Sequence, residues 1–374
     1  MECPLEIFAR ECPDGVAVIA EGREWNSFEL NELVIKESLN IKAGSIESFL
    51  GHTDLKTIVH LFGALRAGAV ALPLNTRNPK WTLPETPAAG AALMLYTSGS
   101  MGIPKLAALS RENFYYSALG SIEAVKLEFQ DKWLLSLPLF HVGGLAILFR
   151  CFMAKATVVL DKNVDCTHLS FVPTQLYRLL KENKTLNAKC ILLGGGPVSE
   201  AMMKQAKERG MNVFETYSLT EMTSQVTMDG KVLPYRELKI EEDGEILVRG
   251  KTLALGLEGW YHTKDLGCWD IDGKLRIIGR KDNLFISGGE NIQPEEIELA
   301  LCQIQGITNA IVVPAKDEEF GMRPVAFIEG PCDLEKIRKE LSSTLPKYKI
   351  PIAIYPLPAH LSLKPNRREL QNII

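Results

Sequence analysis

A loop rich in hydroxyl groups and glycine, residues 97–105, follows the apolar run 92–96 and ends in a lysine. Glycine lets backbone N–H groups turn towards an anion, hydroxyl groups donate further hydrogen bonds, and lysine supplies positive charge. The loop therefore predicts a phosphate-binding site. Its candidate contacts are Thr97, Ser98, Gly99, Ser100, Gly102 and Lys105. A serine- and glycine-rich turn without a ligand is the alternative, and the spacing of a Walker A loop is absent.

A histidine and a glycine run stand at the ends of two predicted strands. His141 precedes a pair of glycines, which would allow a ligand to approach closely, although a lone histidine near apolar residues is more often structural. The second string ends another strand and consists of Gly194, Gly195, Gly196 and Pro197. It is either a simple turn from strand to helix or a flat backbone surface against which a nucleotide base can lie.

Aromatic, hydroxyl and acidic groups come together in two later strings. Tyr217, Thr220 and Glu221 fall within five residues and could stack a base, contact a phosphate and coordinate Mg²⁺. A solvated turn is the alternative for this string. Asp265 stands just before a turn. A carboxylate that accepts two hydroxyl protons is the usual contact to a ribose diol, so Asp265 is a candidate ribose ligand.

The most distinctive charged string begins at Arg280 and includes Asp282. A turn follows it at Ser287, Gly288 and Gly289. Charged residues followed by such a turn fit a hinge that leads into a mobile surface, and an ordinary charged linker is the alternative. Lys364 lies on a polar segment near the C-terminus, where a disordered basic tail would explain it equally well on local grounds.

The pattern of apolar residues predicts the elements that position these groups. Short apolar runs bounded by Gly, Pro or Asp predict buried strands at 16–20, 69–74, 92–96, 133–137, 157–160, 168–172 and 190–193. Helical spacing predicts helices at 57–66, 111–125, 173–182 and 199–209. Pro173 suits a first helical turn and Ser199 an N-cap. Because strand and helix alternate, we expect an α/β protein with a mostly parallel, doubly wound sheet.

The pattern changes after about residue 231. Short strands at 238–240, 244–249 and 274–278 with Asp-Gly turns predict the hairpins of a small β-subdomain. Beyond it comes an α+β pattern with a helix at 295–302 opened by Pro294 and strands at 310–313 and 325–329. A last helix, capped by Asp333, is expected to run to about residue 345, before Pro346. We therefore expect a large N-terminal domain, residues 1–281, and a small C-terminal domain, residues 282–374, joined by a hinge.

Composition excludes several classes of protein. Of the 374 residues 46% are hydrophobic, yet no apolar run reaches the roughly 18–20 residues of a membrane span. The net charge is −4 and no block of lysine or arginine is long enough to indicate a nucleic-acid partner. The eight cysteines are scattered, and the first residues lack the pattern of an export signal. We expect a soluble, cytoplasmic protein with reduced cysteines.

The order of these motifs resembles that of the adenylate-forming superfamily of acyl- and aryl-CoA synthetases, over nearly all of the chain from residue 69 onward. Strings at 133–142, 172–180, 279–298 and 313–326 are most similar to the o-succinylbenzoate–CoA ligases of menaquinone biosynthesis. Three positions depart from the usual pattern. Met101 removes a hydroxyl group from the loop, and Ser218 and Leu363 stand where glycine is usual. The segments 75–92 and 228–238 are also short for the superfamily.

For the nucleotide, the resemblance implies that the loop contacts the β- and γ-phosphates of ATP and that the glycine run and Tyr217 line the adenine pocket. Thr220 and Glu221 match the phosphate and Mg²⁺ contacts, with Glu221 as the metal ligand. Asp265 matches the ribose ligand and Arg280 a second nucleotide contact. ATP, Mg²⁺ and coenzyme A are the cosubstrates and cofactor that this resemblance implies.

For the reaction, the resemblance implies an acid–thiol ligase that adenylates an aromatic acid, 2-succinylbenzoate, and transfers it to coenzyme A. Lys364 is similar to the lysine that bridges the acyl carboxylate and the α-phosphate, and His141 matches a residue lining the acyl site. Asp282 matches a hinge that presents the following Ser-Gly-Gly turn to the coenzyme A channel. Another acyl- or aryl-CoA ligase and a non-catalytic nucleotide-binding relative remain alternatives for the function. For the assembly, a homodimer is an open possibility.

Overall fold

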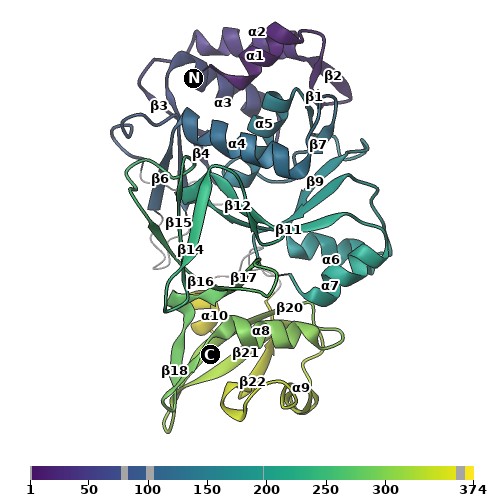
Figure 1. Ribbon diagram of the computed structural model, residues 1–374, viewed down its shortest axis with the longest axis vertical. Helices are drawn as coiled ribbons and strands as arrows, with labels where there is room; N and C mark the ends of the chain where they lie inside the picture. Colours follow the sequence, from purple (N-terminus) through teal and green to yellow (C-terminus); the bar gives the residue numbers. More distant parts are fainter. Residues whose placement is uncertain (1, 77–82, 98–104, 197, 359–366) are drawn as a thin grey trace.

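The computed structural model describes residues 2–76, 83–97, 105–196, 198–358 and 367–374. Its longest axis runs from a helical N-terminal end to a smaller α+β end that holds the C-terminus (Figure 1). The α/β fold class predicted from the alternation of strands and helices is confirmed by mixed sheets that alternate with helices along the chain. Within the described ranges, none of the helices is long and apolar enough to cross a membrane.

A nine-stranded sheet forms the centre of the larger part, in the order β13-β12-β11-β10-β9-β7-β8-β1-β2. Its interior pairs are parallel, whereas β1/β2, β11/β12 and β12/β13 are antiparallel. Sites in such sheets form where parallel strands end, so the ends of β10 and β11 matter here. The bounds are β1 (Val16–Ala20), β2 (Arg23–Asn26), β7 (Lys132–Leu134), β8 (Thr157–Val159), β9 (His168–Phe171), β10 (Cys190–Leu193), β11 (Val213–Leu219), β12 (Ser224–Met228) and β13 (Lys231–Val232).

A second sheet of four strands carries the predicted phosphate loop. Its order is β3-β4-β5-β6, with β3/β4 and β4/β5 parallel and β5/β6 antiparallel. The antiparallel pair brings the two ends of the loop together. The bounds are β3 (Ile46–Leu50), β4 (Val70–Leu74), β5 (Leu93–Thr97) and β6 (Lys105–Leu109).

In the described part of the chain seven helices accompany these two sheets, and the first five gather at the N-terminal end of the molecule (Figure 1). Side-chain caps fix where several of them begin. Asp54 accepts a hydrogen bond from the backbone N–H of Thr57, and Ser199 does the same for Met202, as its predicted N-cap position requires. The bounds are α1 (Pro4–Glu11), α2 (Ser27–Ser38), α3 (Leu55–Ala67), α4 (Arg111–Val125), α5 (Val142–Ala154), α6 (Pro173–Lys181) and α7 (Glu200–Glu208).

The predicted β-subdomain is an antiparallel sheet in the order β14-β15-β16-β17. Three of its strands match the expected runs, but β16, the longest of them, was missed. Its buried side chains include Thr263 and Asp265, so no apolar alternation marks it as a strand. The bounds are β14 (Arg236–Ile240), β15 (Glu245–Gly250), β16 (Tyr261–Trp269) and β17 (Leu275–Arg280).

The remaining elements form a second α+β arrangement with hydrophobic clusters of its own. A sheet in the order β20-β21-β22 packs against helix α8, and the hairpin β18-β19 lies beside it. These hydrophobic clusters share no residue with the main cluster of the larger part, which agrees with a separate C-terminal domain. The boundary of that domain at Asp282 stays a prediction. The bounds are β18 (Phe285–Ser287), β19 (Glu290–Ile292), α8 (Pro294–Gln303), β20 (Asn309–Asp317), β21 (Gly321–Glu329), α9 (Leu334–Leu341), β22 (Ala353–Pro356) and α10 (Arg367–Gln371).

The predicted end of the last capped helix was wrong. Asp333 caps α9 as expected, by accepting a hydrogen bond from the backbone N–H of Lys336, but the helix ends at Leu341 and not near residue 345. Ser342, Ser343 and Thr344 each donate a side-chain hydrogen bond to a carbonyl group three residues earlier. Hydroxyl groups that bond the backbone in this way compete with helical hydrogen bonding, which explains the early end.

Candidate active site

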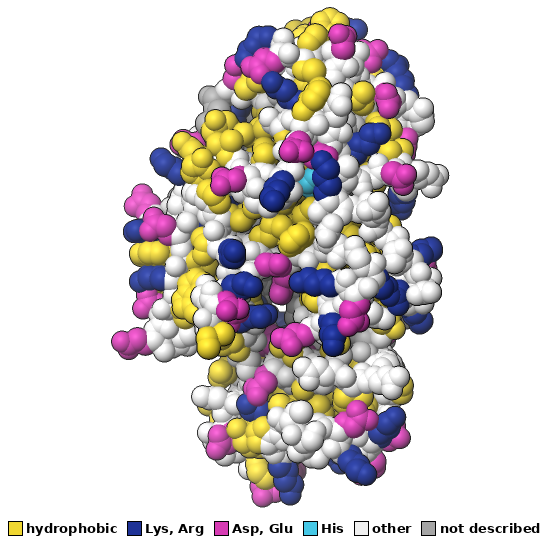
Figure 2. Space-filling view, turned by 45° about the vertical axis from the view of Figure 1, so that its right-hand side comes forward, with side chains coloured by type: hydrophobic (Ala, Val, Ile, Leu, Met, Phe, Trp, Pro, Cys, Tyr) yellow, Lys and Arg dark blue, Asp and Glu magenta, His cyan; other side chains and the backbone are white. Residues whose placement is uncertain are grey.

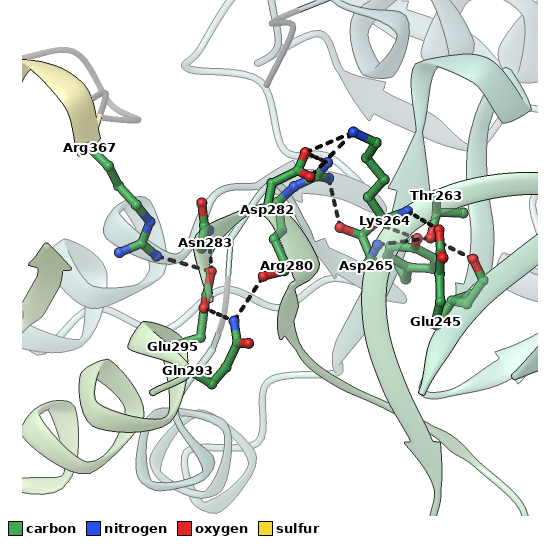
Figure 3. A network of polar contacts seen from close by, with 12 residues as sticks. Glu245, Thr263, Lys264, Asp265, Arg280, Asp282, Asn283, Gln293, Glu295 and Arg367 are labelled. Carbon is green, nitrogen blue, oxygen red and sulfur yellow. Dashed lines mark hydrogen bonds and ion pairs between the residues drawn. The ribbon is translucent and has the colours of Figure 1, made fainter. Parts of the chain in front are cut away.

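Three of the predicted nucleotide contacts meet at the carboxylate of Asp265. The Tyr217 hydroxyl donates to Oδ2 at 2.6 Å, and Nη1 of Arg280 donates to Oδ1 at 2.7 Å. The backbone N–H of Asp265 donates to Oγ1 of Thr263 at 3.0 Å (Figure 3). Two neutral or cationic donors on one carboxylate leave it as an acceptor with lone pairs to spare.

The fold explains why residues so far apart in sequence meet here. Asp265 and Arg280 are directly opposed in the register of β16 and β17. Tyr217 comes from β11 of the large sheet, so this carboxylate joins two sheets. Burial raises the pKa of Asp265 above its ordinary value, and the charge of Arg280 opposes that rise. Burial and the Asp265 charge raise the pKa of Tyr217, which keeps its hydroxyl protonated as a donor.

Thr220 and Glu221 lie in a short 3₁₀ turn, η1 (Thr220–Met222), at the end of β11. The backbone carbonyl of Glu221 accepts a hydrogen bond from the N–H of Ala254 at 2.8 Å. Its carboxylate interacts with Tyr261 of β16, and burial together with the Glu221 charge raises the pKa of Tyr261 to about 12. The predicted metal ligand is therefore half-buried beside a phenol that stays neutral.

Among the described residues, no group of three or more His, Cys, Asp or Glu side chains is placed to hold a metal ion. Mg²⁺ at nucleotide sites is commonly held by one or two carboxylates together with the phosphates of the substrate. A single carboxylate such as that of Glu221 fits this kind of site.

The two ends of the predicted phosphate loop are described, whereas its interior is not. Thr97 and Lys105 are paired across β5 and β6, and Oγ1 of Thr97 donates to the Lys105 carbonyl at 3.4 Å. The side chain of Lys105 is exposed at the base of the loop. Other predicted site residues lie outside the described part of the chain, namely Ser98, Gly99, Ser100, Gly102, Pro197 and Lys364.

The glycine run at the end of β10 is required by the packing of the sheet. A Cβ atom on Gly194 would lie 2.9 Å from Cγ2 of Thr216 on the neighbouring strand β11. Gly195 has a φ of 84°, a conformation that L-residues with a side chain rarely adopt. Gly196 is exposed. These observations account for the first two glycines without a ligand, and contact with a nucleotide base stays a prediction.

His141 is the exposed N-cap residue of α5. Its carbonyl oxygen accepts a hydrogen bond from the N–H of Gly144 at 3.0 Å, and its ring lies 4.5 Å from the ring of Phe140. A Cβ atom on Gly144 would collide with the carbonyl oxygen of Pro138. Gly144 is thus needed for the tight turn that leads into α5. His141 stands at the start of this turn, with its imidazole at the surface.

The pattern of hydrogen bonds changes at η2 (Lys281–Asn283). Asp282 faces β16, where Nζ of Lys264 lies 3.2 Å from its Oδ1. The next residue, Asn283, turns the other way and donates to Glu295 of α8 (Figure 3). The peptide carbonyl of Arg280 also accepts a hydrogen bond from Nε2 of Gln293 at 3.0 Å.

The predicted coenzyme A face is a two-residue hairpin turn. Ser287 and Glu290 pair across β18 and β19, and Gly288 and Gly289 between them have φ values of 56° and 88°. Two positive φ angles are typical of a type I′ turn and explain the Gly-Gly pair. The N–H of Gly288 donates to the carbonyl oxygen of Phe320 at 2.9 Å, so the turn is attached to the end of β20-β21.

On one face of the molecule, acidic and basic side chains surround a hollow at mid-height (Figure 2).

Residues 81–257 match the model of the AMP-binding enzyme family. The 2-succinylbenzoate–CoA ligase of Listeria monocytogenes is 30% identical, over 98% of this chain and 98% of its own length. The chain belongs to the 2-succinylbenzoate–CoA ligase family. The Escherichia coli 2-succinylbenzoate–CoA ligase is 38% identical over 72% of this chain, and that match spans 65% of the relative.

Solved structures of 2-succinylbenzoate–CoA ligase relatives have the same fold. The o-succinylbenzoate CoA synthetase (MenE) of Bacillus subtilis in complex with the acyl-adenylate intermediate OSB-AMP matches with a TM-score of 0.88 and 27% identity, covering 98% of this chain and 97% of that chain. The same enzyme in complex with ATP and magnesium ion matches with a TM-score of 0.85 and 27% identity, covering 96% of each chain. The superfamily and family predicted from the motifs are confirmed.

Sequence reasoning missed two side chains of this site, Tyr261 and Lys264. Each contacts a predicted residue from another segment of the chain, Glu221 and Asp282 respectively. Tyr261 had no signal of its own, because its partner lies forty positions away. Lys264 carried only a weak signal, its place directly before the candidate Asp265, and the sequence does not show that its partner is Asp282.

Proposed function

We propose that this chain is a 2-succinylbenzoate–CoA ligase of menaquinone (vitamin K2) biosynthesis. It converts 2-succinylbenzoate, ATP and coenzyme A into an aryl-CoA thioester, AMP and pyrophosphate through an acyl-adenylate. The observation that carries the proposal is the meeting of Tyr217, Asp265 and Arg280, within a chain of this family. Three candidate residues for one ligand come from different strands, and Tyr217 and Arg280 both donate hydrogen bonds to Asp265.

The Asp265 carboxylate is the proposed ribose contact. An ionised carboxylate offers about four lone-pair sites, and Tyr217 and Arg280 use two of them. The rest suffice for the two hydroxyl groups of a ribose. Arg280 supplies positive charge at the same place and is the proposed second nucleotide contact. Tyr217 and the run 194–197 are the proposed wall of the adenine pocket.

The phosphates are proposed to lie between the turn η1 and the loop. Thr220 is proposed to donate a hydroxyl hydrogen bond to a phosphate, and Glu221 is the proposed Mg²⁺ ligand. Bound Mg²⁺ would neutralise negative charge on the phosphates. Thr97 and Lys105 hold the base of the loop whose amides and hydroxyls are proposed to contact the β- and γ-phosphates. Lys105 adds a second positive charge from the exposed end of β6.

The reaction has two steps. In the first, a carboxylate oxygen of the acid attacks the α-phosphorus of ATP and pyrophosphate leaves, with Lys364 proposed to bridge the two reacting groups. In the second, the thiolate of coenzyme A attacks the acyl carbonyl and AMP leaves. His141 is proposed to line the acyl site. We propose that the C-terminal domain turns about Asp282 between the steps and then presents Ser287, Gly288 and Gly289 to the thiol.

Purified protein with ATP, Mg²⁺, coenzyme A and 2-succinylbenzoate tests the proposal. We expect stoichiometric release of pyrophosphate and AMP and a thioester detectable by mass spectrometry. Turnover with other benzoates but not with 2-succinylbenzoate would indicate a different aryl-CoA ligase. Binding of ATP without turnover of any acid would indicate a non-catalytic relative. The cytoplasmic location and the homodimer stay predictions, to be checked by cell fractionation and light scattering.

A further inference from the structure

Lys264 has a backbone conformation that glycine usually occupies. Its φ is 63°, in the left-handed region that side-chain-bearing residues rarely adopt. It lies at the centre of a bulge in β16, because Glu245 pairs with Leu266 while Leu247 pairs with His262. One residue of β15 therefore faces three of β16. Bulges beside functional sites often redirect a side chain, and this one is directly next to Asp265.

The bulge directs the lysine side chain to Asp282. Nζ of Lys264 lies 3.2 and 3.3 Å from the two carboxylate oxygens of Asp282, and the backbone N–H of Lys264 donates to Oε1 of Glu245 at 3.1 Å (Figure 3). The neighbouring cation cannot replace it, because Lys281 binds Asp243 and Glu245 at 2.6 and 3.1 Å. Lys264 is thus the side chain that neutralises Asp282 most directly.

Asp282 matters because it competes for Arg280. Nη1 of Arg280 donates to Asp265 at 2.7 Å, while Nη2 lies 3.9 Å from Oδ2 of Asp282. Two carboxylates therefore lie on either side of one guanidinium group. Without a cation on Asp282, its negative charge would attract the guanidinium away from Asp265.

We propose that Lys264 is a positioning residue of the nucleotide site, which keeps Arg280 on Asp265 by neutralising Asp282. The inference rests on the proposed function, since the ligand that benefits is ATP. It assigns to Lys264 an effect on ATP binding that passes through a carboxylate and not through direct contact. A purely structural role of the ion pair would instead change stability and leave ATP affinity unaltered.

The test measures ATP affinity by isothermal titration calorimetry, and the KM for ATP and kcat in acid-dependent ATP–pyrophosphate exchange. We expect Lys264→Met to weaken ATP binding roughly threefold to fivefold, the range of a partly exposed ion pair, and to raise KM with little change in kcat. Lys264→Arg should keep the affinity of the wild type. Lys264→Gly should match Lys264→Met, although only glycine relieves the left-handed backbone.

The decisive variant is the double substitution Lys264→Met with Asp282→Asn. Removing the competing charge should restore ATP affinity to within about twofold of Asp282→Asn alone. Lys239→Met, which removes a cation paired with Glu241 on the same sheet, is the matched control and should bind ATP normally. Wild-type affinity in Lys264→Met, or a double variant that stays weak, would overturn the inference. A wild type that binds no ATP would overturn the proposed function itself, and the inference with it.

Discussion

At the scale of single residues, Asp265 combines burial with two strong donors. Its side chain is 9% exposed and accepts hydrogen bonds from a phenol and a guanidinium group. Such a carboxylate is fixed in orientation before a ligand arrives, because both of its oxygens already have partners. Preorganisation of this kind lowers the entropic cost of binding.

Asp265→Asn tests the proposed ribose contact. Hydrogen bonds to a charged group contribute about 1.5–3 kcal/mol, so ATP affinity should fall roughly tenfold to a hundredfold. The wild type should lose a similar factor when 2′,3′-dideoxy-ATP replaces ATP, whereas the variant should bind both nucleotides alike in calorimetry. Asp272→Asn, in the exposed turn between β16 and β17, is the control. Equal sensitivity of both proteins to the dideoxy nucleotide would contradict the assignment.

His168 predicts a pH dependence of stability. It is fully buried, and Nε2 lies 3.1 Å from the carbonyl oxygen of Val125, so that nitrogen carries the proton of a neutral ring. Burial lowers the pKa of His168 below its ordinary value of about 6.5. As the pH falls below about 6.5, the unfolded chain therefore takes up a proton that the folded chain does not, and the free energy of unfolding decreases.

Urea denaturation at about pH 7.5 and pH 5.5 measures this loss, through the fluorescence of the tryptophans. We expect the difference between the two pH values to shrink in His168→Gln, whose amide can still donate to Val125. His52→Gln, at an exposed position, should leave the difference as it is in the wild type. A His168→Gln protein with the same pH dependence as the wild type would show that other groups cause it.

At the scale of elements, Arg367 at the start of α10 attaches the C-terminal segment to α8. Its guanidinium group donates to both oxygens of Glu298, to Oε1 of Glu295 and to the carbonyl of Val312. Glu298 is buried, which raises its pKa, although Arg367 opposes that effect. This ion pair fixes the chain three residues after Lys364.

Arg367→Met should lower the free energy of unfolding by about 3–5 kcal/mol, because it leaves the Glu298 carboxylate buried without its cation. Replacing the partner as well, in Arg367→Met with Glu298→Met, should recover part of that loss. Urea denaturation followed by circular dichroism measures both. Lys339→Met, at an exposed position of α9, is the control. A double variant as unstable as Arg367→Met would argue against an effect of the unpaired charge.

The elements also show what could be predicted from the sequence. Helix α4 has its expected bounds, and Ser199 caps α7 as expected, since both depend on local spacing and capping. Strand β16 could not be found in this way, because its buried positions are those of the site and are polar. Asp265 was recognised in the sequence as a candidate ribose contact, whereas Lys264 beside it was not recognised as part of the site. The ion pair of Lys264 depends on the bulge, which only the pairing of strands reveals.

At the scale of the whole molecule, the proposed hinge at Asp282 lies between the β14–β17 sheet and the C-terminal part, which has hydrophobic clusters of its own. The side chain of Asp282 bonds to Lys264 of the β14–β17 sheet, and that of Asn283 bonds to Glu295 of α8. A short segment with partners on both sides is suited to a change in the relative position of the two parts. In the proposed mechanism the two half-reactions need different parts of the C-terminal domain, Lys364 in the first step and the turn after β18 in the second.

Lys364→Ala should therefore separate the half-reactions. Loss of one charge-stabilising group should slow acyl-adenylate formation roughly a hundredfold or more, measured as pyrophosphate release. Thioester formation from synthetic acyl-adenylate and coenzyme A should stay close to the wild-type rate, because the proposed second step does not use this lysine. Lys347→Ala, an exposed lysine of the same part, is the control for both steps. Equal slowing of both steps by Lys364→Ala would mean that the lysine supports the fold or both reactions, and that the two steps do not call for two positions of the C-terminal part.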